Sequence, residues 1–335
     1  MSRFKVEENQ YGILPSIKIV DDTVGTSIEI DQMGAALLNF FVKTHRGPLN
    51  LIDGFASYEE MTEGKSPRSS ILAPFYGRML NDSYTFDGIP YLLDASDIHA
   101  VSGLVSREKF QVTSIDINDE SANIVLTCDK LIASPVTCYP FDVLISVSYK
   151  LFGRKLQVEI SGKNVGKIPA PFACGWHPYF RLSEKGIDSL ALSLPFEKLI
   201  LTDSAYIPYG NEMTYSSISN LPGSDFRPSL FQKKRIIGRR MLNACYSNAA
   251  NNLNAISESK IENLDNGSVL SIRQSRGVLF SSTGVDTQER FRESIILHPA
   301  EFIWNAFNRK DLQEQIRLEA GQERMFSIEI EFSQP

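Results

Sequence analysis

The segment Arg324-Met325-Phe326-Ser327-Ile328-Glu329-Ile330-Glu331-Phe332 alternates large apolar residues with polar ones from Phe326 onward. Successive side chains of a β-strand point to opposite faces of a sheet. A spacing of two therefore predicts a strand with one face on an apolar core and the other in water. Strands of this one-sided kind are typical of antiparallel sheets. The segment thus predicts an antiparallel sheet that it joins.

The same spacing of two recurs along the chain, in residues 28–30, 115–117, 156–160 and 190–196. Tight turns between strands are indicated at Asp87-Gly88 and Asn266-Gly267, because these residue pairs adopt the backbone angles of two-residue hairpins. Helical periodicity is scarce and suggests a turn or two of helix in residues 55–62. We therefore predict an all-β protein, a large antiparallel β-sandwich.

No segment has the composition of a confident domain linker. The 335 residues would suffice for two average domains or for one large sandwich. The Gly/Pro/Ser-rich residues 216–228 and the Ser/Asn-rich residues 247–260 are predicted loops. Because alternating strands continue to the C-terminal segment, we expect one domain, residues 1–335.

The charge balance limits the partners that the chain can bind. The formal net charge is −6 and the calculated pI is about 5.4, which argues against a nucleic-acid partner, since phosphates require a cationic surface. A local exception is a basic cluster around Gly238. This cluster could hold an anionic group of a substrate or form a solvated surface. Its members are Lys233, Lys234, Arg235, Arg239 and Arg240.

Several classes of protein are not indicated. The first residues lack the apolar core of a signal peptide, and no window approaches the ~20 apolar residues that span a bilayer, so we expect a cytoplasmic protein without a membrane partner. The four cysteines have no paired close spacing, which predicts reduced thiols. Dispersed histidines and the absence of Gly-rich phosphate loops predict no metal and no cofactor. The protein is expected to be a monomer or a homodimer.

The strongest candidate for chemistry is the segment Cys174-Gly175-Trp176-His177-Pro178-Tyr179-Phe180. Its histidine is one of four in the chain, and two large aromatic residues and a proline would hold the imidazole rigidly on a mostly apolar wall. Histidine gives or takes a proton near neutral pH, and a rigid frame is what general acid–base catalysis requires. The alternative interpretation is a histidine buried in the core.

Residues 164–180 resemble the proton-donor motif of the aldose 1-epimerases, the galactose mutarotase family. Residues 74–81, 139–141, 207–210 and 299–308 are similar to further segments of this family in the same order along the chain. The resemblance implies a galactose mutarotase-like supersandwich, a small-molecule sugar as partner, and His177 as the general acid. Arg78, in the Gly-Arg pair, would bind the sugar, and Trp176 and Tyr179 are candidate substrate-binding residues beside His177.

The base departs from the usual pattern of the family. Where the family usually has a Glu-Pro pair, this chain has His298-Pro299. A neutral imidazole of His298 can accept the proton of the anomeric hydroxyl, and Glu301 is the other candidate. In an extended segment residues 298 and 301 point to opposite faces, so both cannot serve.

Two sugar-binding positions also differ. The family's second histidine aligns with Ser102, and His99 lies three residues earlier, so either could face the sugar. The aspartate that grips sugar hydroxyls is replaced by Asn243, which would bond a hydroxyl without charge assistance.

These observations predict an aldose 1-epimerase-like isomerase that interconverts the α and β anomers of a hexose or a hexose phosphate. The alternative is a non-catalytic carbohydrate-binding or regulatory protein of the same fold. Glycoside hydrolysis by two carboxylates also suits a β-sandwich, but no carboxylate lies in a motif as distinctive as that of His177.

Overall fold

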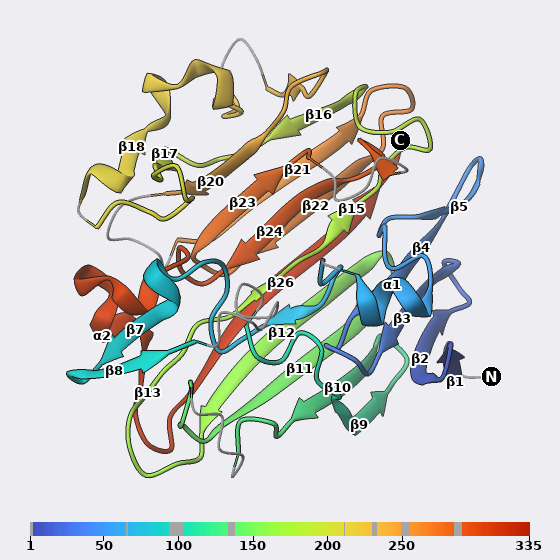
Figure 1. The fold of residues 1–335 in the computed structure, drawn as a ribbon. Coiled ribbons are helices and arrows are strands. Elements are labelled where there is room, and N and C mark those ends of the chain that lie inside the picture. The colour runs from blue at the N-terminus through green and yellow to red at the C-terminus, as the bar shows by residue number, and fades with distance from the viewer. Residues whose placement is uncertain are drawn as a thin grey trace.

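The computed structural model describes residues 3–64, 66–93, 103–132, 138–210, 212–229, 233–248, 255–284 and 290–335. His99 and Ser102 lie outside the described residues. Strands dominate the described chain, as Figure 1 shows, and they pair in an antiparallel manner throughout the registers given below. The predicted all-β class with antiparallel sheets is therefore confirmed.

The largest sheet in the described part of the chain has nine strands, in the order β19-β16-β21-β22-β26-β12-β11-β10-β9. The strand predicted from the alternating segment is β26, which lies between β22 and β12. The bounds are β9 Gln111–Ile117, β10 Ala122–Cys128, β11 Val143–Phe152, β12 Lys155–Asn164, β16 Leu190–Ser193, β19 Arg235–Ile236, β21 Ser257–Asn263, β22 Val269–Gln274 and β26 Glu323–Ser333.

A second sheet of eight strands has the order β18-β17-β20-β23-β24-β14-β6 within the described ranges, and β15 also pairs with β24. Its central strand β24 thus contacts β23 on one side and the consecutive short strands β14 and β15 on the other. The bounds are β6 Ile71–Leu72, β14 Gly175–Trp176, β15 Tyr179–Phe180, β17 Lys198–Ile200, β18 Tyr215–Ser217, β20 Asn243–Ser247, β23 Val278–Ser282 and β24 Ile295–Ala300.

The N-terminal strands form a five-stranded sheet, β1 Phe4–Tyr11, β2 Leu14–Asp21, β3 Thr26–Asp31, β4 Leu37–Thr44 and β5 Gly47–Asn50, in sequence order. Two short pairs complete the strands, β7 Ser83–Phe86 with β8 Ile89–Leu92 and β13 Ala170–Pro171 with β25 Arg317–Leu318. The helices are α1 Tyr58–Glu63, which confirms the expected short helix, and α2 Gln313–Ile316.

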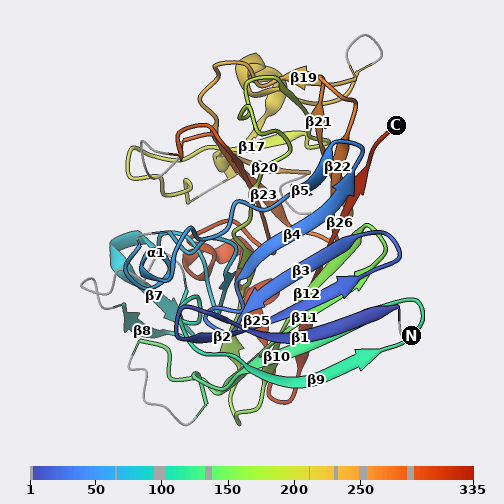
Figure 2. The same ribbon diagram turned by 90° about the vertical axis from the view of Figure 1, so that its right-hand side faces the viewer.

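The sheets are arranged in layers around an apolar core. Figure 2 separates β20 and β23 of the eight-stranded sheet from β21 and β22 of the nine-stranded sheet. The N-terminal sheet is tied to β11, where the buried hydroxyl of Tyr149 donates to the carbonyl oxygen of Ala35 over 2.7 Å. Along β10 and β11, buried residues alternate with more exposed ones. The nine-stranded sheet thus presents one face to the core and one to water, as the spacing of two predicts.

The register of β12 and β26 explains why their apolar residues form the core. Leu156 lies opposite Ile330 and Val158 lies opposite Ile328, and all four side chains are buried. Directly opposite residues share a face of the sheet, so the two strands bury one continuous apolar surface. The predicted turns are also found, since Asp87-Gly88 joins β7 to β8 and Asn266-Gly267 lies between β21 and β22.

The predicted loops are partly correct. Residues 216–228 hold the end of β18 and two turns of 3-10 helix, Ile218–Asn220 and Pro222–Ser224. Within residues 247–260, β20 ends at Ser247 but β21 already begins at Ser257, so the loop is shorter than expected at its C-terminal end. No helix in the described ranges has the length and apolar character needed to cross a bilayer.

The core position of β26 leads to a stability prediction. Replacing the fully buried Ile328 by Ala should lower the free energy of unfolding by about 2–5 kcal/mol, because the change removes buried methyl groups and leaves a cavity. Ile115, on the edge strand β9, is 43% exposed, and Ile115→Ala should change the same quantity by about 0.5 kcal/mol or less. Urea denaturation measures both, and equal losses would contradict this account of the core.

Candidate active site

Two histidines that are far apart in the sequence lie next to each other. The ring centroids of His177 and His298 are 5.1 Å apart, with the rings at 78° to one another. The backbone register explains this contact. Gly175 of β14 lies opposite Ala300, and Tyr179 of β15 lies opposite Ile296. His177 and His298 are the midpoints of these two stretches and therefore face each other across the antiparallel pair.

The register of β20, β23 and β24 shows which other residues share this face. Phe280 lies opposite His298, and in the next row Asn243 lies opposite Ser282, which in turn lies opposite Ile296. Residues directly opposite one another point to the same side of a sheet, and alternate residues return to that side. Asn243, which is exposed, is thus on the same face as the two histidines.

Aromatic rings surround His298 on this face. The ring centroid of Tyr76 lies 5.0 Å from that of His298, and the centroid of Phe280 lies 6.5 Å from it. Trp304 extends the group, with its centroid 5.6 Å from Phe280. These rings form a mostly apolar floor. A floor of this kind is suited to stacking against the weakly polar face of a pyranose ring.

Arg78 lies at the edge of this floor. Its side chain is exposed, and its guanidinium carbon is 5.9 Å from the ring centroid of Tyr206. Tyr206 is tied to the floor because its carbonyl oxygen accepts a hydrogen bond from Nε1 of Trp304. Gly77 precedes Arg78 with a φ of +72° and packs directly against Trp304. The structure thus brings a positive charge close to the aromatic floor.

His298 is buried and electrically neutral in this environment. It is 5% exposed, and burial of the ring, with a second contribution from His177, holds the pKa of His298 well below its usual range. Its Nε2 is closed off from solvent and has no hydrogen-bond partner among the described residues. A side chain at Gly175 would place its Cβ 2.8 Å from this nitrogen, so the ring occupies space that only glycine leaves open.

Glu301 occupies a different environment. It is fully buried, and its Oε1 lies 2.5 Å from Nη2 of Arg276 and 3.2 Å from Nε of Arg324. Its Oε2 accepts a 3.2 Å hydrogen bond from the backbone N–H of Cys174. Both carboxylate oxygens are therefore engaged inside the protein, which leaves His298 as the better placed candidate for the base.

The two aromatic neighbours of His177 do not reach the surface, contrary to the expectation that they contact a substrate. Trp176 is fully buried, and its Nε1 donates to the carbonyl oxygen of Ser69 over 2.8 Å. Tyr179 is 1% exposed and lies edge-on to His177, with ring centroids 5.3 Å apart. Trp176 belongs to the core because alternation turns it away from the face that holds His177. Tyr179 packs beside His177 on the same side of the sheet.

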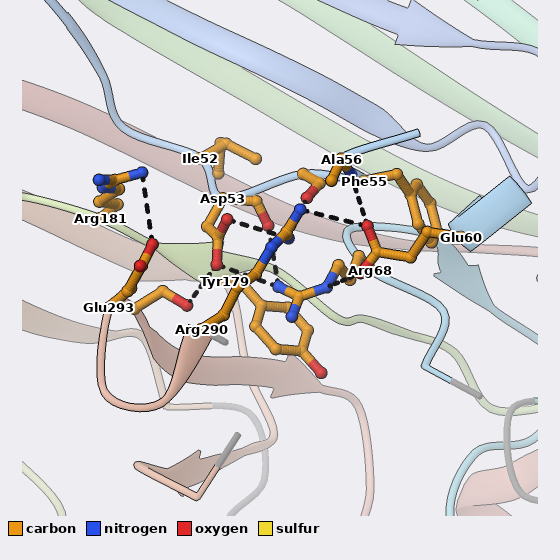
Figure 3. A network of polar contacts seen from close by, with 12 residues as sticks. Ile52, Asp53, Phe55, Ala56, Glu60, Arg68, Tyr179, Arg181, Arg290 and Glu293 are labelled. Carbon is orange, nitrogen blue, oxygen red and sulfur yellow. Dashed lines mark hydrogen bonds and ion pairs between the residues drawn. The ribbon is translucent and has the colours of Figure 1, made fainter. Parts of the chain in front are cut away.

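A buried polar network behind Tyr179 was not predicted from the sequence. Figure 3 shows Asp53, Glu60, Arg68 and Arg290 joined by hydrogen bonds and ion pairs next to the Tyr179 ring. These residues come from separate parts of the chain. No pattern in the sequence indicates that they meet, because only the packing of the sheets brings them together.

The basic cluster around Gly238 lies away from the histidines. Lys233 and Lys234 line a cavity of about 720 Å³ over β16, β21 and β22, together with Lys260, Glu258 and Glu262. Lys234 forms an ion pair with Glu262, and Lys260 forms one with Glu258. Within the cluster, Arg235 and Arg240 donate hydrogen bonds to the backbone carbonyl oxygens of Asp225 and Ile236. Lys234, Arg235 and Arg240 thus have local partners, which favours the solvated-surface interpretation over an anion site.

Comparisons with known proteins bear on the family and the fold. A family model described as aldose 1-epimerase matches residues 16–331. The uncharacterized protein YihR of Escherichia coli K12 is 28% identical over 137 residues, which cover 40% of this chain and 42% of that protein. The match thus spans less than half the length of this curated relative.

Solved structures share the fold over nearly the whole chain. The galactose 1-epimerase from Lactobacillus acidophilus superposes with a TM-score of 0.79 at 16% identity, covering 100% of this chain and 99% of that chain. The GalM/aldose epimerase homologue from C. elegans has a TM-score of 0.77 at 17% identity, covering 98% and 99% respectively. A galactose mutarotase-like protein from Clostridium acetobutylicum has a TM-score of 0.79 at 15% identity, covering 99% and 98%. Identities this low show a common fold.

The close approach of Gly77 to Trp304 can be tested without measuring activity. In Gly77→Ala the new Cβ would lie 2.3 Å from Cβ of Trp304, so the indole must move and the tryptophan emission spectrum should change. The other tryptophan, Trp176, is fully buried and provides a constant background. Gly88→Ala is the matched control, because Gly88 also has a positive φ, +79°, but nothing within 4 Å. An unchanged emission spectrum in Gly77→Ala would contradict the packing described here.

Proposed function

The chain belongs to the aldose 1-epimerase family, and on that premise we propose that it interconverts the α and β anomers of a hexose or a hexose phosphate. The reaction requires a proton to reach the ring oxygen while another leaves the hydroxyl on the anomeric carbon. The ring then opens, the carbonyl end rotates, and closure reverses both proton transfers. Two titrating side chains at one site are sufficient for this chemistry.

The contact between His177 and His298 is the observation that carries the proposal. We assign His177 as the general acid because it is only half-buried and can reach a bound sugar. We assign His298 as the base because its depressed pKa keeps the imidazole neutral and able to accept a proton. Glu301 is not assigned, since Arg276 and Arg324 hold its carboxylate.

Substrate binding is assigned to residues on the same face. Arg78 would bind sugar hydroxyls or a phosphate with its exposed guanidinium group, which suits both kinds of oxygen acceptor. Asn243 would bond a further hydroxyl from the row next to His298. His99 and Ser102 stay sequence-based predictions for this site. The expected partner is a small sugar, and we expect the protein to act in the cytoplasm.

A non-catalytic sugar-binding protein is the second candidate, and one observation favours it. Nε2 of His298 has almost no contact with solvent, so a sugar hydroxyl reaches it only if binding rearranges the surrounding side chains. Without that rearrangement, His177 and Arg78 would still recognise a sugar. Binding of an aldose without faster anomer exchange would support this second function over the first.

Removing the proposed acid gives the first functional test. His177→Ala should abolish acceleration of anomer exchange, measured by exchange NMR on a panel of free and phosphorylated aldoses, while thermal stability stays nearly unchanged. His45→Ala is the control, because His45 lies on an exposed turn, where its ring is hydrogen-bonded to the carbonyl oxygen of Pro335. A large loss of stability in His177→Ala would restore the core-histidine interpretation.

The depressed pKa of His298 predicts the shape of the pH profile. A group with a lowered folded pKa keeps its neutral form as the pH falls, so kcat/KM should hold through pH 6.5 and decline only well below it. The unfolded chain takes up a proton near pH 6.5 and the folded chain does not. Wild-type stability should therefore fall below pH 6.5 more steeply than that of His298→Asn. Thermal melts at several pH values measure this. If the melting temperatures of the two proteins fell equally steeply below pH 6.5, a neutral, buried His298 would be contradicted.

A further inference from the structure

Asp53 lies at the centre of the buried network and contacts three separate segments. It is 8% exposed, and its backbone N–H donates to the carbonyl oxygen of Tyr179 over 2.9 Å. Its Oδ2 accepts hydrogen bonds from Nη1 of Arg68 at 3.1 Å and from Oγ of Ser294 at 2.8 Å. Its Oδ1 accepts a hydrogen bond from Nη1 of Arg290 at 3.2 Å. One carboxylate thus joins segments that are distant in the sequence.

The first two contacts lead to His177. Arg68 is 1% exposed, and its guanidinium carbon lies 4.2 Å from the ring centroid of Tyr179, whose edge meets His177. The residues after Arg68 then bracket the backbone of this histidine. The N–H of Ser69 donates to the carbonyl oxygen of His177 over 2.8 Å, and the N–H of His177 donates to the carbonyl oxygen of Ser70 over 3.2 Å.

The third contact leads to His298. Ser294 is 2% exposed and immediately precedes β24, the strand that carries His298. A strand advances by a fixed rise per residue, so an anchor at the residue just before it limits how far the whole strand can slide or tilt. Asp53 therefore holds both the segment that frames His177 and the start of the strand that carries His298.

The charges of the network are balanced, which argues that its members act as a unit. Arg68 pairs with Asp53 and Glu60, and Arg290 pairs with the same two carboxylates. Removing one partner of a buried ion pair leaves an uncompensated charge that must move or be hydrated. A change at Asp53 would therefore displace Arg68 from the Tyr179 ring, and the displacement would be passed to His177.

We propose that Asp53 is a positioning residue that sets the distance and angle between the His177 and His298 imidazoles. It touches neither the rings nor a substrate and acts through Tyr179, Arg68 and Ser294. The kinetic part of this inference rests on the proposed anomer exchange, whereas the structural part does not. Catalytic rates are sensitive to such placement, because a misplacement of about 1 Å lowers a rate by about a hundredfold.

The test compares Asp53→Asn with Asp21→Asn in the full chain. Asp21 is the matched control, because it is also a buried aspartate paired with an arginine, Arg3 at 2.7 Å, but it lies in the N-terminal sheet. The chain has four histidines, so the ring signals of ¹³C-labelled histidine can be assigned by substitution and followed one by one. Thermal melting, kcat and KM complete the measurements.

Asp53→Asn should shift or broaden the ring signals of His177 and His298, leave His45 unchanged, and lower kcat about tenfold or more with KM changed less than about threefold. Asp21→Asn should lower the melting temperature but leave all three signals and kcat unchanged. Folded Asp53→Asn with both signals and kcat unchanged would overturn the proposal. If the wild-type protein does not accelerate anomer exchange, the proposed function fails, and the histidine signals alone still decide the role of Asp53.

Two further variants keep the proposal testable if Asp53→Asn does not fold. Ser294→Ala removes the anchor of β24 and should disturb the signal of His298 more than that of His177. Arg68→Lys removes the planar group over Tyr179 and should disturb the signal of His177 more than that of His298. A loss of thermal stability in both variants without this selectivity would assign the network a general structural role and overturn the positioning role.

Discussion

The antiparallel pairing of β24 with β14 and β15 is the constraint on which the site depends. Gly175 opposite Ala300 and Tyr179 opposite Ile296 leave His177 and His298 no arrangement other than facing positions. A slip of one residue in β24 would turn His298 into the core and bring Pro299 to the outer face, because side chains alternate along a strand. The contact between the two histidines is therefore set by the backbone register of these strands.

Burial of His298 gives a physical reason why an imidazole suits this position better than a carboxylate would. An ionised carboxylate packed against the rings of Tyr76 and Phe280 would lose much of its hydration. Imidazole is neutral when it acts as a base and tolerates an apolar environment. Glu301 shows the contrast, since its buried carboxylate forms ion pairs with Arg276 and Arg324. The two candidate bases thus differ in their surroundings, which are aromatic for His298 and cationic for Glu301.

The eight-stranded sheet divides two tasks between its faces. Leu279 and Leu297 are fully buried on the face that packs into the core, whereas His298, Phe280 and Asn243 share the other face. The core packs against these strands from one side, and Asp53 of the network in Figure 3 contacts Ser294, which precedes β24, and Tyr179 of β15. Rigid strands with a buried polar anchor are a suitable support for two rings that must keep a fixed mutual placement.

The amino-acid sequence by itself determined the class of fold, because a spacing of two, as in Phe326 to Phe332, states which side of its own strand each residue occupies. Turn chemistry at Asp87-Gly88 and the His177 segment were readable for the same local reason. Alternation does not state which strand lies alongside. Only the tertiary structure therefore shows that His298 contacts His177 and that Trp176 lies in the core. It also shows that Glu301 pairs with two arginines and that Asp53 and Arg68, from separate segments, lie in contact. Register and packing join residues that no local pattern connects.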